Sequence, residues 1–202
     1  MTRRADYSSE EWALLASAPE IIGLGMLGVS RSGPVGKLRE LLILRSCLQA
    51  RAVPWEFSQN PLVMDILGDS SARPHKLLTL PSTDDSWASL IVMVITARLR
   101  MLEYCEEVAA LIADRAPRDE AAGLKRWLML IARRVAGASG DRWLGMGPKV
   151  SEAESAMLQQ LSMSLQIPTV DAAPTPAELE AMFNLRSAGD DEGISGYRRN
   201  WQ

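Results

Sequence analysis

The residues best suited to bind a small ligand surround a glycine-rich stretch late in the chain. Arg142 and Lys149 flank this stretch, and Ser151 follows it at the start of a predicted helix. Backbone amides at a helix N-terminus bind anions, so these side chains and the amides near Ser151 could hold one. Ser151 and Glu154 also form a capping-box pattern, which would occupy the same amides. Anion binding therefore stays open as an alternative function.

A second candidate is the run Gly23-Leu24-Gly25-Met26-Leu27-Gly28, which matches the dinucleotide-binding form G-x-G-x-x-G. That fingerprint requires a strand directly before it and a helix directly after it. Here a helical pattern precedes the glycines, and Ser30 to Pro34 predicts a loop after them. We therefore expect no nucleotide cofactor, and we interpret the glycines as positions where another helix approaches closely. A ligand pocket between this segment and the central helix is the alternative.

Catalytic patterns are not found in the sequence. The one histidine, His75, lies in a predicted loop. A catalytic triad needs a histidine oriented beside a nucleophile, and a metal site in a helical bundle needs carboxylate–histidine pairs on facing helices. Glu103 and Glu107 share a helix face, which a solvated surface explains better than a pair of catalytic acids. The sequence therefore favours a protein that is not an enzyme and holds neither metal nor cofactor.

Charge and composition narrow the function classes further. Lys and Arg number 22 against 25 Asp and Glu, so the net charge is -3 and gives no electrostatic argument for nucleic-acid binding. The polar N-terminus predicts no secretory signal, and the longest apolar run is shorter than the ~20 residues of a membrane span. Cys47 and Cys105 are expected to be buried, reduced thiols, although a disulfide between neighbouring helices stays possible. We expect a cytoplasmic protein.

The element that organises the predicted fold is a long helix from Asp84 to about Arg115. Its apolar residues follow each other in steps of three and four, the helical period: Trp87, Leu90, Ile91, Val94, Ala97, Met101, Cys105, Val108 and Ile112. From Ala88 to Ala97 nearly every side chain is apolar, which predicts a first half covered on all sides. Charged residues in the second half predict one face in water. Leu90 to Ile95 alone could form a strand, but the continuing period favours helix.

Shorter helices are predicted from caps and prolines. The capping box Ser8–Glu11 opens a helix that Pro19 should end, so that a second helix begins there. A helix after Gly33-Pro34 should run to about Ala52, with Leu38, Leu41, Leu42, Leu48 and Ala52 on one side. Asn60-Pro61 opens a short helix, Leu62 to Leu67.

Two more helices follow the central one. The first, after Ala116-Pro117, should pack antiparallel on the central helix because the connection is short, with Leu124, Trp127, Leu128, Ile131 and Val135 inward. The last begins at Ser151. Together these elements predict an all-α, bundle-like domain of about six to seven helices, residues 8–167.

The segment 168–202 differs in composition and predicts an extended C-terminal tail. It is rich in proline and glycine, contains few apolar residues, and ends with Tyr197, Arg198, Arg199 and Trp201. Aromatic and arginine side chains carry much of the energy of protein interfaces. We therefore predict a non-catalytic adaptor or assembly subunit, homo- or hetero-oligomeric, that contacts other proteins through this tail and loop aromatics such as Trp143. The alternative is a disordered end with incidental aromatics.

Several of these segments are similar to a family of small, helical, mostly uncharacterised bacterial proteins. Tyr7-Ser8-Ser9-Glu10-Glu11-Trp12, Ala18-Pro19 and Ser32-Gly33-Pro34-Val35-Gly36 resemble the opening of the family; Asp119-Glu120-Ala121-Ala122, Trp143-Leu144-Gly145-Met146-Gly147 and Val150-Ser151-Glu152-Ala153-Glu154 resemble its end. Trp143 and Met146 stand where the family usually has phenylalanine, and Pro148 where it has glycine, so any role of that loop would be altered. The resemblance covers about half of the chain. It implies a bacterial helical protein and no particular activity.

Overall fold

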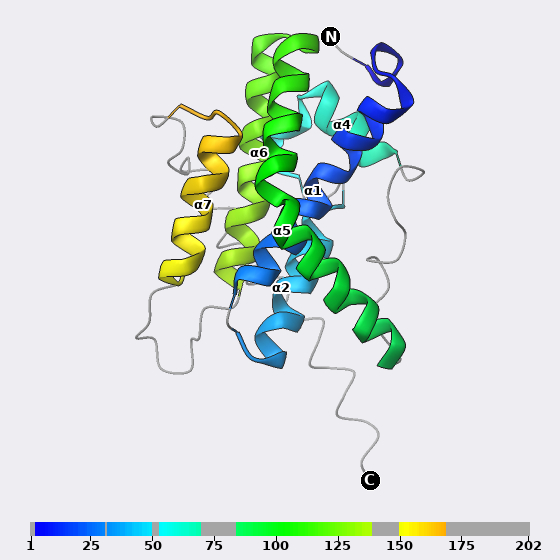
Figure 1. Ribbon diagram of the computed structural model, residues 1–202. Coiled ribbons are helices and arrows are strands. Elements are labelled where there is room, and N and C mark those ends of the chain that lie inside the picture. Colours follow the sequence, from blue (N-terminus) through cyan, green and yellow to red (C-terminus); the bar gives the residue numbers. More distant parts are fainter. Residues whose placement is uncertain (1–2, 31, 50–52, 70–83, 139–149, 169–202) are drawn as a thin grey trace. The chain divides into compact units, whose positions relative to one another are not determined.

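The computed structural model describes residues 3–30, 32–49, 53–69, 84–138 and 150–168 (Figure 1). The chain divides into two compact units, residues 1–172 and 173–202, and every described residue belongs to the first. Within the described ranges the structure contains helices and no strands. The predicted tail therefore lies almost entirely outside the described residues, and the predicted domain boundary near residue 167 stays a prediction.

Seven α-helices and one short 3-10 helix make up the described part of the chain. They are η1 (Arg4–Asp6), α1 (Ser9–Val29), α2 (Pro34–Cys47), α3 (Trp55–Ser58), α4 (Pro61–Gly68), α5 (Asp84–Arg115), α6 (Arg118–Ala138) and α7 (Glu152–Ser164). The predicted all-α fold with one long central helix is confirmed, and α5 has the predicted bounds.

Helix α1 continues through Pro19, so the predicted break there is wrong. The capping box at its start forms as predicted, with the Ser8 side chain accepting from the Glu11 amide at 3.1 Å. A proline inside a helix removes one backbone hydrogen bond and crowds the preceding turn. The carbonyl that loses its donor is that of Leu15, four residues before Pro19. The Tyr104 hydroxyl donates to the neighbouring Leu14 carbonyl at 2.9 Å and so links this turn to α5. Burial of α1 on both sides of Pro19 then keeps the helix continuous.

The glycines of α1 are contact positions for other helices, as predicted. Antiparallel packing of α1 on α5 brings Arg115 within 3.1 Å of Glu11 at one end and Arg98 within 3.1 Å of the Gly28 carbonyl at the other. A Cβ added at Gly25 would lie 2.4 Å from the Met101 sulfur. The missing side chains therefore let the two helices approach closely.

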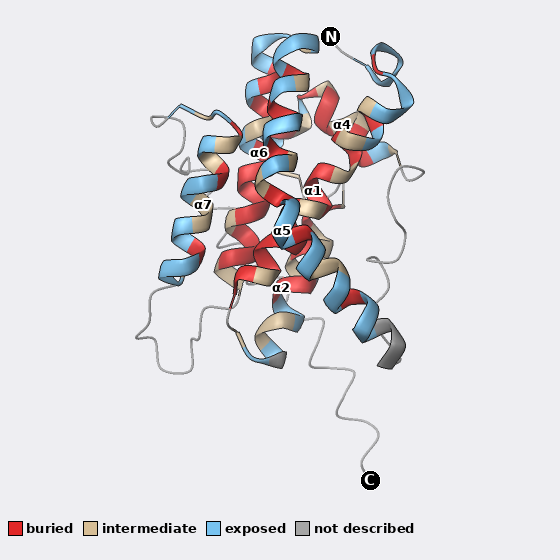
Figure 2. Ribbon diagram, viewed as in Figure 1, coloured by how far each residue is buried: buried red, intermediate tan, exposed pale blue. Residues whose placement is uncertain are grey.

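Among the helices that the structure describes, one, α1, is long and apolar enough to cross a membrane, judged by length and composition alone. Core helices of globular proteins pass the same test, and most of α1 is buried inside the first unit (Figure 2). The expectation that every apolar run is too short to span a membrane was wrong because it divided this helix at Pro19.

Helix α6 contributes Trp127, the largest fully buried side chain among the described residues. Its predicted inward stripe is buried: Leu124, Trp127, Leu128, Ile131 and Val135. The predicted packing partner is only partly right, because α6 contacts α1 and α2 more extensively than it contacts α5. The short connection keeps the ends of α5 and α6 together, while the apolar α1 takes the position beside both helices.

Helix α2 is rotated relative to the prediction. Leu41, Leu44, Cys47 and Leu48 are buried, whereas Leu38 and Leu42 are exposed. The prediction placed Leu38 and Leu42 on the same side as Leu41 and Leu48 and did not include Leu44, which is buried. A helix buries only one stripe, and here that stripe also includes the carboxylate of Glu40.

Asn60 links the start of α4 to α6. Its Oδ1 accepts from the Val63 amide at 3.2 Å, and its Nδ2 donates to the Glu120 carbonyl at 2.8 Å. A Cβ at Gly123 would lie 2.3 Å from this Nδ2, so the glycine makes room for the contact. Both the predicted N-cap and the predicted short helix are confirmed.

Asn60→Ala is expected to lower the free energy of unfolding by about 2 kcal/mol, because it removes a cap and a buried hydrogen bond together. Asn60→Ser keeps a cap oxygen but cannot donate to the Glu120 carbonyl, so it should cost less. Urea unfolding of the two variants beside the parent measures the contributions of the cap and of the buried hydrogen bond. Equal stability of Asn60→Ala and the parent would contradict the linking role.

Candidate functional site

Most of the residues that the sequence suggested as a site lie outside the described residues. This holds for Tyr197, Arg198, Arg199 and Trp201 of the tail and for Arg142, Trp143 and Lys149 of the loop before α7. Two further aromatics, Trp55 and Phe57, lie outside the main helical stripes in the sequence. In the structure Trp55 is exposed, whereas Phe57 is buried in the core.

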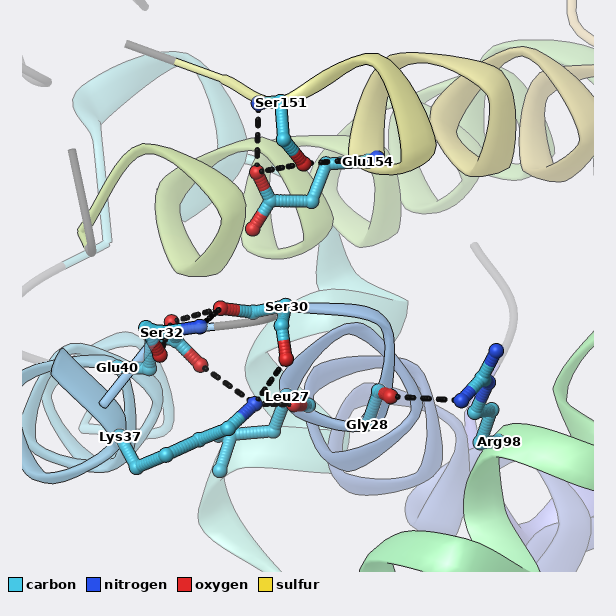
Figure 3. A network of polar contacts seen from close by, with 9 residues as sticks. All are labelled: Leu27, Gly28, Ser30, Ser32, Lys37, Glu40, Arg98, Ser151 and Glu154. Atoms are coloured by element: carbon cyan, nitrogen blue, oxygen red, sulfur yellow. Dashed lines mark hydrogen bonds and ion pairs between the residues drawn. The ribbon is translucent and has the colours of Figure 1, made fainter. Parts of the chain in front are cut away.

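Ser151 caps α7 and is already paired. Its Oγ accepts from the Glu154 amide at 3.3 Å and donates to Glu154 Oε2 at 2.8 Å, and the same carboxylate oxygen accepts from the Ser151 amide at 2.8 Å (Figure 3). The chain's own carboxylate thus occupies the position where an external anion would approach these amides.

A buried polar cluster joins the end of α1 to α2 (Figure 3). The Glu40 carboxylate is fully buried and accepts from Ser30 Oγ at 2.6 Å and Ser32 Oγ at 2.7 Å. Lys37 Nζ donates to the carbonyls of Leu27 and Ser30 and lies 3.7 Å from Glu40 Oε2. An ammonium group at a helix C-terminus stabilises the last carbonyls, so the cluster fixes the connection between the two helices.

Among the described residues, no three His, Cys, Asp or Glu side chains are placed to hold a metal ion. One hollow, between α1, α4 and α6, is lined by Pro19, Glu20, Ile66 and Trp127 among others and leaves no room for a water molecule. Beside the α1 glycines, the space is filled by Leu44, Met101 and Arg98. These parts of the structure therefore do not form a ligand cavity.

The two cysteines are free and buried, as predicted. Burial raises the pKa of Cys105 to about 12. Burial also raises the pKa of Cys47, and the nearby Arg134 guanidinium offsets part of this increase. Only the thiolate is nucleophilic, so both groups should be unreactive in the folded chain at pH 8.

A thiol reagent such as Ellman's reagent is therefore expected to label neither cysteine at pH 8 within minutes, and to label both in 8 M urea at a rate typical of thiols with a pKa of ~8.5. Rapid labelling of the native chain would show that the helices around Cys47 or Cys105 open readily.

The described surface exposes a short row of large apolar side chains on α2, made of Val35, Leu38 and Leu42, and a longer row on the first half of α5. We call it the α5 row: Trp87, Ile91, Val92, Ile95 and Leu99, with exposed fractions from 41% to 79%. Figure 2 shows the exposed colour along most of this half of the helix. The prediction that this half is covered on all sides is therefore wrong.

The position of α1 explains the exposure. Gly28, next to the last residue of α1, packs against Val94 and Arg98 of α5. Because the two helices are antiparallel, the turns of α5 before Val94 continue past the end of α1 (Figure 1). Leu90 and Ala97 are still buried, on the side of α5 that faces α1, whereas the α5 row lies on another side.

Sequence reasoning missed the α5 row, although its signal was present. A helical run that is apolar on all sides can be buried completely inside its own domain. It can equally bury one face in the domain and another face against a partner protein. Monomeric proteins rarely expose contiguous apolar patches larger than a few hundred Å². A row of five such side chains over about three turns is close to that size, so it is a candidate binding surface.

No family model, curated protein or solved structure matches this chain.

Proposed function

We propose that this protein is a non-catalytic adaptor or assembly subunit that binds other protein chains through the α5 row. The observation that carries the proposal is the exposure of Trp87, Ile91, Val92, Ile95 and Leu99 beyond the end of α1. Burial of apolar surface contributes ~25 cal/mol per Å², so covering this row would stabilise a complex.

Two further observations support association over ligand binding or catalysis. The core beside the α1 glycines is filled by side chains of the chain itself. At the start of α7, the amides of Ser151 and Glu154 donate to the side chains of Glu154 and Ser151. The predicted contacts of Tyr197, Arg198, Arg199, Trp201 and Trp143 remain part of the proposal, as does the cytoplasmic location. The bacterial origin belongs to it through the resemblance to helical bacterial proteins.

Site-specific photo-crosslinking tests the proposal. A photoreactive phenylalanine analogue at Leu99, introduced into the full chain in growing bacterial cells, is expected to form a covalent adduct with a protein. The matched control is the same analogue at Met163 of α7, which is 63% exposed but does not belong to the α5 row. The adduct should form at Leu99, disappear with Ile95→Glu in the same chain, and be weak at Met163. Equal yields at both positions, or none at Leu99, would overturn the proposal.

A further inference from the structure

We propose that the chain that covers the α5 row is a second copy of this protein, and that two α5 helices pack on each other in antiparallel directions about a two-fold axis. This inference rests on the proposed function, because it names the partner of the same surface.

The spacing of the row fits packing against an identical helix. Trp87, Ile91, Ile95 and Leu99 follow each other at intervals of four residues. Side chains at this interval form a ridge along a helix, and two such ridges interdigitate in the commonest class of helix packing. Two copies of this chain present the same ridge, so each supplies what the other requires. A two-fold interface has this property, since the same surface is used twice.

A two-fold axis through the centre of the row would place complementary side chains of the two copies opposite each other. The midpoint of the row falls between Ile91 and Ile95, so a two-fold axis there places Trp87 of one copy opposite Leu99 of the other. Trp87 is the largest and least exposed member of the row and Leu99 is the most exposed. The register therefore pairs the most protruding side chain with the broad ring at the opposite end.

The order of charged residues along α5 favours antiparallel over parallel packing of the two helices. In the sequence the helix begins with Asp84 and Asp85, and it exposes Arg98 and Arg100 near the other end of the row. Arg98 donates to the Gly28 carbonyl at 3.1 Å, and Arg100 Nε lies 3.9 Å from Glu103 Oε2. Antiparallel packing about the midpoint brings the acidic start of one helix towards the arginines of the other. Parallel packing would instead bring like charges together, which is unfavourable.

The overhang of α5 makes this pairing sterically accessible. The turns before Val94 extend past the end of α1, so a second helix can approach them without displacing α1. On the same side of α5, three turns after Ile95, Glu106 accepts a hydrogen bond from Ser164 Oγ of α7 at 3.1 Å. The partner helix would thus extend a face that α7 contacts further along.

Sedimentation equilibrium of the full chain tests the inference. We expect a dimer, twice the 22.2 kDa of the chain, that dissociates on dilution. Ile91→Glu and Ile95→Glu should each weaken it at least tenfold, because a two-fold axis buries every introduced charge twice. Both side chains are more than half exposed, so far-UV circular dichroism should be unchanged. Met163→Glu is the control and should leave the dimer intact.

Cysteine cross-linking tests the direction. Chains carrying Trp87→Cys and Leu99→Cys should be joined by a short bis-maleimide when the two are mixed, and much less when each is alone. Cys47 and Cys105 are buried, so the parent chain should not react. Cross-linking of each variant alone, and not of the mixture, would overturn the antiparallel arrangement.

The outcomes separate the two proposals. A full chain that stays monomeric at 100 μM, or a dimer that tolerates Ile91→Glu and Ile95→Glu, would overturn the second-copy inference. In that case an adduct at Leu99 with a mass other than twice that of the chain would still support the proposed function. Absence of both the dimer and the Leu99 adduct would overturn both.

Discussion

Gly25→Leu is expected to lower the free energy of unfolding by about 3 kcal/mol, the upper end of what overpacking usually costs. A Cβ at this position would lie 2.4 Å from the Met101 sulfur and 3.1 Å from Met101 Cβ. Met101 is completely buried, so its side chain has little space into which it can move. The gain in helix propensity, ~0.8 kcal/mol, offsets only part of the clash. The midpoint of thermal unfolding should fall by roughly 6–12 °C.

Gly68→Leu is the matched control. Gly68 is the last residue of α4, is exposed, and has no atom within 4 Å of an added Cβ. The same substitution there should change the midpoint by less than about 2 °C, since exposed sites usually vary within ±0.5 kcal/mol. If Gly25→Leu melts like the parent, the close contact of α1 with α5 does not determine stability.

Lys37→Met should also lower the free energy of unfolding by about 3 kcal/mol, the lower end of the range for breaking a buried ion pair. The Glu40 carboxylate is fully buried, so it would lose its cation without gaining water. The carbonyls of Leu27 and Ser30 would lose their donor at the same time. The Lys37 side chain is about one-third exposed, which places the expected cost at the lower end. Urea unfolding measures the loss.

Two further variants test whether the unpaired charge of Glu40 causes this loss of stability. Glu40→Gln added to Lys37→Met removes that charge and keeps an acceptor for the two serines, so the double variant should be more stable than Lys37→Met alone. Arg100→Met is the control, because Arg100 and Glu103 have the same i,i+3 spacing but are both exposed. Exposed pairs contribute ~0–1 kcal/mol, so this change should be small. A double variant no more stable than Lys37→Met would exclude the explanation.

Local patterns in the sequence determined the helices and their starts. The capping boxes at Ser8 and Ser151 and the Asn60-Pro61 pair place three helix starts correctly. The apolar period from Trp87 to Ile112 identified α5 with its observed bounds. These features depend on contacts within one or two turns, which the sequence contains in full. The same applies to the α1 glycines, whose cost in helix propensity requires a neighbouring helix as compensation.

Only the tertiary structure decided which side of each helix is covered. Leu38 and Leu42 are exposed because α2 turns another stripe towards α6, and Pro19 stays inside α1 because packing on both sides outweighs the lost hydrogen bond. The α5 row is exposed because α1 ends opposite Val94. An apolar side chain has the same propensity whether it faces a neighbouring helix or water. Its burial depends on where a helix from a distant part of the sequence ends, and the local sequence does not determine that position.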